Sequence, residues 1–109
     1  MKYSSTRGAV SGISFKQAVM MGLAEDGGLL VPDEFPEVSN HLPDWRSLSF
    51  QQLCLEIMQL FVGQDLRREE LENLIAKSFV FFRHPLITPL KKLKHCSVLE
   101  LFHGPTFAF

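Results

Sequence analysis

The amino-acid sequence predicts an α/β chain, in which a mainly helical N-terminal subdomain of about three helices with short strands leads into the first strand of a larger domain. Ser14 and Ser49 are each followed three residues later by a glutamine, which is the capping-box pattern of a helix start. Apolar residues recur at helical spacing after both serines and again after Arg67. A compact apolar run at residues 98–102 favours a strand.

The composition is typical of one globular unit of modest size. The 109 residues leave room for one domain with a small core, or for the front of a larger one. The formal net charge is −1, so the chain has no basic excess that would attract nucleic acid. No apolar run approaches the ~20 residues that span a bilayer, and the N-terminus lacks the apolar region of a signal peptide. We therefore expect a cytoplasmic protein without a nucleic-acid or membrane partner, and the two cysteines predict no metal site.

The first ten residues combine hydroxyl groups with a guanidinium. Residues 3–10 are short, polar and compatible with an extended edge segment. Ser5, Thr6 and Arg7, next to Ser4, bring together hydrogen-bond donors in a set suited to hold a phosphate group. The alternative is an ordinary solvated edge strand.

The first helix is predicted at residues 14–22, with Gly22 or the turn at residues 26–28 as its stop. Its apolar face is expected to hold Phe15, Ala18, Val19, Gly22 and Leu23. Residues 29–31 then form a brief strand that ends at Pro32. We interpret residues 26–28 as a turn rather than a phosphate cradle, because no helix N-terminus follows them.

Residues 33–48 are predicted to form a proline-broken loop anchored by Trp45. A second helix at residues 48–63 carries a wide apolar stripe, and a third is predicted from about Arg67 to Phe82. The stripe of the second helix consists of Phe50, Leu53, Cys54, Ile57, Met58 and Phe61, widened by Leu55 and Leu60. The stripe of the third consists of Leu71, Leu74, Ile75, Ser78, Phe79 and Phe82. The basic residues at 91–95 are expected to lie in a solvated turn.

The tail is the most distinctive part of the sequence. Val98, Leu99, Leu101 and Phe102 form a short strand candidate that is apolar enough for burial on both faces. Residues 103–106 then predict a sharp turn, because glycine tolerates a positive φ and proline restricts φ.

Two stretches of this sequence resemble the threonine synthase family. The tail E-L-F-H-G-P-T-F-A-F, residues 100–109, resembles the segment that in this family leads directly into the lysine that holds pyridoxal phosphate (PLP). The stretch S-F-x-x-A-x-x-x-G-L-A-x-D-G-G-L-x-x-P, residues 14–32, resembles the N-terminus of the same family. The resemblance implies that residues 1–95 form an N-terminal subdomain and that residues 96–109 begin a PLP-binding domain of fold type II, similar to the tryptophan synthase β subunit.

The family resemblance also implies a reaction and a set of site residues. The reaction is the conversion of O-phosphohomoserine and water to L-threonine and phosphate by a PLP-dependent carbon–oxygen lyase. Phe109 would form a wall against the cofactor ring, and His103, Gly104 and Thr106 would line the cofactor-binding turn, although His103 could equally cap that turn. The remainder of the catalytic domain would be the partner of this segment. Ser5, Thr6 and Arg7 stay candidates for the substrate phosphate on their residue types, and the resemblance adds no ligand contact for them.

The family's PLP-binding lysine is not among these 109 residues, so we expect the segment alone to be inactive. Two phenylalanines in the last three residues indicate the start of a buried element. We therefore expect a chain cut short, either as a deliberate fragment or, preferably, at a modified lysine that carries PLP. Two alternatives to a threonine synthase remain: a threonine synthase-like PLP phospholyase, and a non-catalytic helical interaction module.

Overall fold

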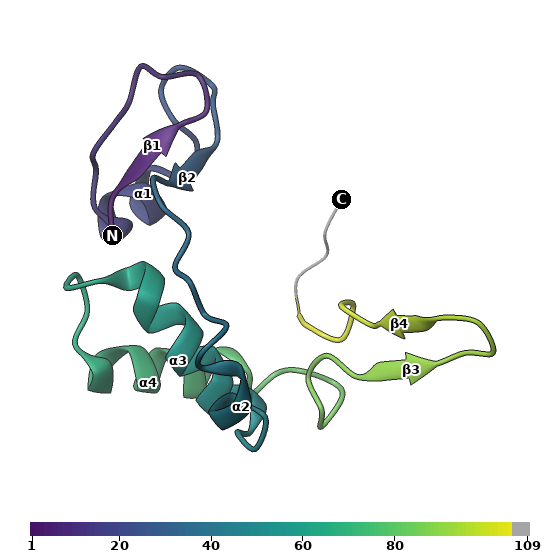
Figure 1. The fold of residues 1–109 in the computed structure, drawn as a ribbon. Helices are drawn as coiled ribbons and strands as arrows, with labels where there is room; N and C mark the ends of the chain where they lie inside the picture. The colour runs from purple at the N-terminus through teal and green to yellow at the C-terminus, as the bar shows by residue number, and fades with distance from the viewer. Residues whose placement is uncertain (106–109) are drawn as a thin grey trace.

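The computed structural model describes residues 1–105, and within them the chain forms four helices and two small antiparallel sheets (Figure 1). In chain order the elements are β1 (Tyr3–Ser5), α1 (Phe15–Met21), β2 (Leu30–Pro32), α2 (Leu42–Trp45), α3 (Phe50–Val62), α4 (Arg68–Ser78), β3 (Leu90–Lys92) and β4 (Ser97–Leu99). The prediction of an α/β segment with short strands is therefore confirmed, with one helix more than the three expected.

The N-terminal unit pairs β1 with β2 and places α1 beside them (Figure 1). Tyr3 lies opposite Pro32 and Ser5 opposite Leu30, so proline occupies the end of an edge strand where it disrupts no further pairing. The predicted capping box of α1 is confirmed, because Ser14 Oγ accepts from the Gln17 backbone N–H at 3.3 Å and the Gln17 side chain accepts from the Ser14 N–H at 2.9 Å.

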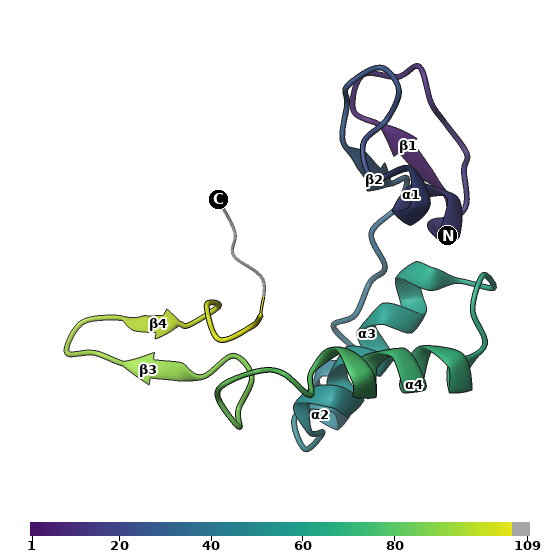
Figure 2. The ribbon, with the colours of Figure 1, turned by 180° about the vertical axis from the view of Figure 1, so that it is seen from behind.

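The core lies between α3 and α4, which pack against each other as an antiparallel pair (Figures 1 and 2). Its buried members are Leu55, Val62, Leu71 and Ile75. Val62 is only 2% exposed, yet the sequence pattern did not include it, and Leu55, expected only to widen the stripe, is a central core residue. The buried face of α3 is therefore rotated relative to the predicted stripe, and Ile57 of that stripe is 37% exposed.

Two hydrogen bonds join the N-terminal unit to the helix pair. The Tyr3 hydroxyl donates to the backbone carbonyl of Phe61 at 2.9 Å, and the Lys16 N–H donates to Asp65 Oδ2 at 2.7 Å. The rings of Tyr3 and Phe15 lie 5.9 Å apart at the same junction. These contacts make residues 1–79 one continuous structure, which we call the helical body.

Two boundary predictions were wrong. The loop predicted at residues 33–48 contains the short helix α2, in which Pro43 occupies the first turn and the His41 ring stacks on Trp45 at 5.3 Å. The third helix ends at Ser78 rather than Phe82. The four residues that follow are aromatic or β-branched and lose side-chain freedom in a helix, so the chain turns there instead, with the Phe82 N–H donating to the Phe79 carbonyl.

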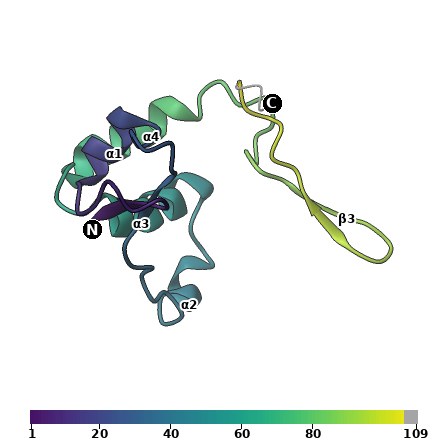
Figure 3. The same ribbon diagram turned by 90° about the horizontal axis from the view of Figure 1, so that it is seen from above.

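The last part of the described chain, residues 83–105, is a hairpin that projects away from the helices, and we call it the arm (Figures 1 and 3). Leu90 pairs with Leu99 and Lys92 with Ser97, so β4 is an antiparallel hairpin strand that is three residues long. The radius of gyration is 16.1 Å, above the about 13 Å typical of a compact domain of ~100 residues. The difference reflects the projecting arm.

The predicted burial of the tail strand on both faces was wrong for the described residues. Val98 and Leu99 are 42% and 53% exposed, and Leu101 and Phe102, which lie beyond β4, are 69% and 73% exposed. A two-stranded hairpin cannot cover both of its own faces, and the helical body does not reach it (Figure 3). Within residues 1–105, no helix combines the length and the apolar character that crossing a membrane requires.

Candidate functional site

The residues predicted from the sequence lie at two distant places. Ser5 is the last residue of β1 and residues 6–7 follow it in the N-terminal unit, whereas His103 and Gly104 lie at the base of the arm (Figure 1). Thr106 and Phe109 lie outside the described residues. The structure therefore brings together His103 and Gly104 but places residues 5–7 far from them.

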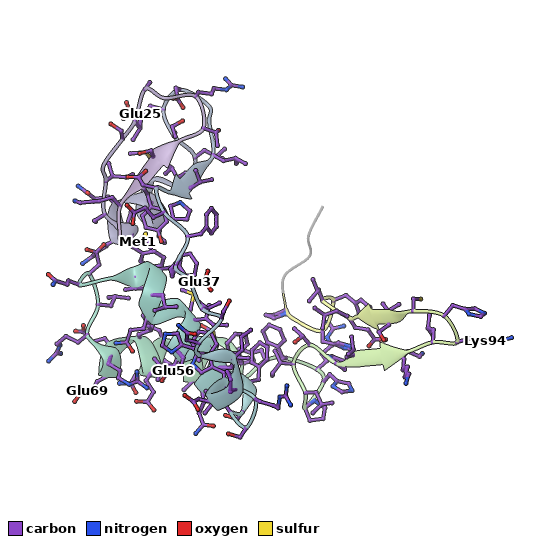
Figure 4. All side chains as sticks on the ribbon, in the orientation of Figure 1. Met1, Glu25, Glu37, Glu56, Glu69 and Lys94 are labelled. Atoms are coloured by element: carbon purple, nitrogen blue, oxygen red, sulfur yellow. The ribbon has the colours of Figure 1, made fainter. Side chains whose placement is uncertain are left out.

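In the N-terminal unit, the carboxylate of Asp26 is the centre of a group of hydrogen bonds. The single hydrogen of the Ser5 hydroxyl is shared between the two oxygens of this carboxylate, which lie 2.7 and 2.8 Å from Ser5 Oγ. The backbone N–H groups of Ala9 and Gly28 donate one hydrogen bond each, at 2.9 and 2.8 Å. The Ser5 hydroxyl, followed by the Gly28 N–H, holds the pKa of Asp26 below its ordinary value. We call Ser5, Ala9, Asp26 and Gly28 the Asp26 cluster; Glu25, which precedes Asp26 in the chain, is labelled in Figure 4.

Gly28 is required by this cluster. A Cβ at position 28 would collide with Ser5 Oγ and would lie 3.0 Å from both Asp26 Oδ1 and the Arg7 backbone nitrogen. The sequence analysis predicted a turn at residues 26–28 but not its partner. Ser5 lies 21 residues away along the chain, so local sequence patterns contained no signal for this contact.

The three groups predicted to hold phosphate already have partners within the chain. Ser5 donates its hydroxyl hydrogen to Asp26, Thr6 Oγ1 accepts from the Leu29 N–H at 3.0 Å, and Arg7 Nη1 donates to the Asp26 carbonyl at 3.0 Å. Only the Thr6 hydroxyl hydrogen and the remaining Arg7 donors are available to an anion, which would also meet the negative charge of Asp26. Phosphate binding here stays a prediction.

The second place contains a carboxylate–imidazole pair that the sequence analysis did not single out. Glu100 Oε2 and His103 Nε2 are 2.8 Å apart, and the two side chains are only 20% and 17% exposed. The i, i+3 spacing of glutamate and histidine within the tail motif was the available signal. The His84 ring lies 4.9 Å from that of His103, and the Phe102 ring lies 4.7 Å from it.

Backbone hydrogen bonds hold this pair in place. The Glu100 N–H donates to the Pro89 carbonyl at 3.0 Å, and the Arg83 N–H donates to the His103 carbonyl at 2.9 Å. Glu100 and His103, the first and fourth residues of the tail motif, are thereby attached to the segment of the arm that precedes β3. His103 is more than a cap of its own turn, because its side chain contacts Glu100 and His84.

The sequence analysis expected glycine at position 104 because it tolerates a positive φ, and this reason was wrong. Its φ lies outside the left-handed region, so its role is not to reach a positive φ. A Cβ at this position would lie 3.0 Å from Phe82 Cζ and 3.2 Å from Phe82 Cε1. The Phe82 ring approaches the backbone at this position, so a side chain here would make the ring shift, and this contact closes the base of the arm.

Lys94 marks the tip of the hairpin in Figure 4. All six lysines of the chain are exposed. No group of three or more His, Cys, Asp or Glu residues within positions 1–105 is arranged to hold a metal ion.

Comparison with known proteins identifies a family. The family described as "Threonine synthase N terminus" matches residues 2–79. Threonine synthase from Schizosaccharomyces pombe is 47% identical over 112 aligned positions, which cover 100% of this chain and 22% of that protein. A protein named threonine synthase-like 2 from Xenopus laevis is 43% identical, with 100% of this chain and 24% of that protein covered.

Solved structures agree with this comparison. PLP-bound threonine synthase from Brucella melitensis superposes with a TM-score of 0.85 at 36% identity, over 96% of this chain and 23% of that one. Threonine synthase from yeast superposes with a TM-score of 0.82 at 41% identity, over 99% of this chain and 23% of that one. The chain thus spans between a fifth and a quarter of the length of these relatives.

Proposed function

The chain belongs to the threonine synthase family, and we propose that it supplies the N-terminal part of an enzyme that converts O-phosphohomoserine and water to L-threonine and phosphate with PLP. The observation that carries this proposal is the 47% identity to a threonine synthase across the whole chain, including the tail motif around His103. That identity also rules out the alternative in which the tail resembles the family by accident.

The described tail suits one side of a PLP site. His103 offers a polar, mostly buried imidazole, and Gly104 keeps side-chain atoms away from the backbone opposite the Phe82 ring. When bound, PLP supplies an electron sink for the bond changes of the substrate. The chain's own contribution is positional: the hydrogen bonds at Glu100 and His103 fix the segment that carries these groups.

The amine that binds PLP must come from outside these 109 residues. A lysine that attacks an aldehyde needs a neutral amine, which burial promotes by disfavouring the charged form. All six lysines here are exposed, which argues against each of them. We therefore propose that this segment alone is inactive and that residues 96–109 begin the fold type II domain that contains the lysine, with Thr106 and Phe109 at the cofactor.

A threonine synthase-like PLP phospholyase is the second candidate. It is supported by the 43% identity to threonine synthase-like 2 from Xenopus laevis, because that value is close to the 47% found for the S. pombe enzyme. Such a protein would act on a similar phosphorylated substrate and release phosphate without threonine.

A chimera tests the proposal. This chain replaces the aligned 22% of S. pombe threonine synthase, and a matched control chimera carries the aligned part of Xenopus threonine synthase-like 2 instead. With O-phosphohomoserine and PLP, we expect the first chimera to release threonine and phosphate in equal amounts. A product ratio like that of the control chimera would select the second candidate. A folded chimera that forms neither product would contradict the proposal.

A further inference from the structure

We propose that Glu100 is a positioning residue that holds His103 in one orientation and one tautomer, so that His103 Nδ1 accepts a hydrogen bond from a donor group of the bound substrate or cofactor. This inference rests on the proposed function. It concerns two residues of the described chain and a contact between them that is present before any ligand binds.

The tautomer follows from the contact itself. An ionised carboxylate only accepts hydrogen bonds, so His103 Nε2, 2.8 Å from Glu100 Oε2, must carry the hydrogen. A neutral imidazole has one donor nitrogen and one acceptor nitrogen, and the hydrogen bond of one decides the role of the other. In a neutral His103, Nδ1 is therefore the acceptor, and within residues 1–105 it makes no hydrogen bond of its own.

The orientation follows from the packing around the pair. The His84 ring contacts His103, and His84 Nδ1 accepts from the Leu86 N–H at 3.1 Å, so the neighbouring imidazole is also held in place. The carbonyl of His103 is fixed by the Arg83 N–H. Glu100, His84 and Phe102 thus enclose three sides of the ring, and rotation of the imidazole would break the bond to Glu100.

The chemistry of the acceptor defines what it can recognise. A neutral Nδ1 cannot donate to a phosphate oxygen, but it can accept from an amine, an ammonium or a hydroxyl group. An amino-acid substrate carries such a nitrogen, whereas its phosphate group does not. The pair therefore favours the amino end of the substrate, or a donor of the cofactor, over the phosphate end.

The competing explanation is that Glu100 only stabilises the base of the arm. The two explanations differ in what happens when His103 is already absent. A positioning residue acts through His103, so its removal then costs no further activity, whereas a purely structural residue would still matter. A double-mutant cycle in the chimera with the S. pombe enzyme separates them.

Four variants of that chimera are compared with the parent: Glu100→Ala, Glu100→Gln, His103→Ala and the double variant with alanine at both positions. We expect Glu100→Ala to lower kcat about 10- to 100-fold with KM changed less than about 3-fold. Glu100→Gln should stay within about 3-fold of the parent, because the amide oxygen still accepts from Nε2. The double variant should be no slower than His103→Ala.

A matched control is Glu70→Ala. Glu70 is also in an i, i+3 pair, with Arg67, but it lies at the start of α4 in the helical body, far from His103. We expect its kcat to equal that of the parent. If Glu70→Ala lowers kcat as much as Glu100→Ala does, the loss is one of general stability and the inference fails.

Crystal structures of the parent chimera and of the two Glu100 variants give a readout that does not depend on activity. We expect the His103 ring to keep its orientation in Glu100→Gln and to rotate in Glu100→Ala. A ring that stays unchanged in Glu100→Ala, or an additive loss of kcat in the double variant, overturns the inference. A parent chimera that makes no threonine counts instead against the proposed function, and the ring orientation still decides the role of Glu100.

Discussion

The helical body and the arm are both rich in apolar residues, but only the body buries them. In the body, Val62 and Leu71 are 2% and 4% exposed, whereas in the arm Leu90 and Leu101 are 66% and 69% exposed. The sequence predicted burial both for Leu71 in the body and for Leu101 in the arm. Apolar content therefore predicts burial only where another part of the same chain covers the apolar side chains.

The helical body provides that surface because α3 and α4 are long enough to face each other. Helices of 13 and 11 residues present two apolar stripes that cover one another. The strands of the arm are three residues each, and a two-stranded hairpin has no second layer. We expect apolar surface of this kind to be covered by other parts of the protein.

The largest difference between the helical body and the arm is expected for alanine substitutions at two leucines, one in each region. Leu71→Ala removes side-chain atoms from the core and leaves a cavity, and we expect it to lower the free energy of unfolding by about 2–5 kcal/mol. Leu99→Ala in the arm should change it by less than about 0.5 kcal/mol, because Leu99 is 53% exposed. Urea denaturation of the 109-residue chain measures both, and equal losses would show that the arm is as well packed as the body.

Alanine substitutions at two glycines test whether the body is packed more rigidly than the arm. In the body, Gly28→Ala forces a Cβ against Ser5 Oγ and two further hydrogen-bonded atoms, and we expect a loss of about 1–3 kcal/mol in the free energy of unfolding. In the arm, Gly104→Ala meets only the Phe82 ring, which can move aside. Thermal melting of both variants should place Gly28→Ala clearly lower, and the reverse order would contradict a rigid Asp26 cluster.

The pH dependence of stability tests the Asp26 cluster, because the pKa of the Asp26 carboxyl group is lowered in the folded chain. The hydrogen bonds from Ser5 and Gly28 lower the pKa of Asp26 in the folded chain. The unfolded chain therefore binds the proton more readily, so this stabilisation is complete above about pH 5 and is lost as the pH falls through the folded-state pKa. Asp26→Asn should lower the melting temperature at pH 7, with a smaller difference at pH 3.

The control for this measurement is Glu25→Gln, which changes an exposed neighbour of Asp26 and should leave the melting temperature unaltered at both pH values. A difference between Asp26→Asn and the parent that is as large at pH 3 as at pH 7 would show that the carboxylate charge is not what stabilises the cluster.

The smallest effect on stability is expected on the apolar surface of the arm. Leu90→Lys combined with Leu101→Lys should change the free energy of unfolding by less than about 0.5 kcal/mol. It should nevertheless reduce the binding of a hydrophobic dye and the self-association that we expect of the 109-residue chain, because both depend on exposed apolar area. A parent chain that is a monodisperse monomer without dye binding would contradict the assignment of the arm as a contact surface.

Several features were predictable from the sequence because their causes are local. The capping boxes at Ser14 and Ser49 join groups three residues apart, and both are confirmed. The glycine ends of α1 and α3, at Gly22 and Gly63, also depend only on neighbouring backbone. The family resemblance is of the same kind, since motifs are read from consecutive residues.

Other features were decided only by tertiary structure, because their partners are distant in the chain. The Ser5–Asp26 hydrogen bonds span 21 residues and the Tyr3–Phe61 hydrogen bond spans 58. The contact near Gly104 depends on Phe82. The solvated turn predicted at residues 91–95 was wrong for Lys91 and Lys92, which lie in β3 and pair with Val98 and Ser97. Amino-acid order alone thus determined where α1 and α3 begin and which family the chain belongs to. Which apolar and polar groups found partners was decided by the packing, because burial and long-range hydrogen bonds require a second surface brought close in space.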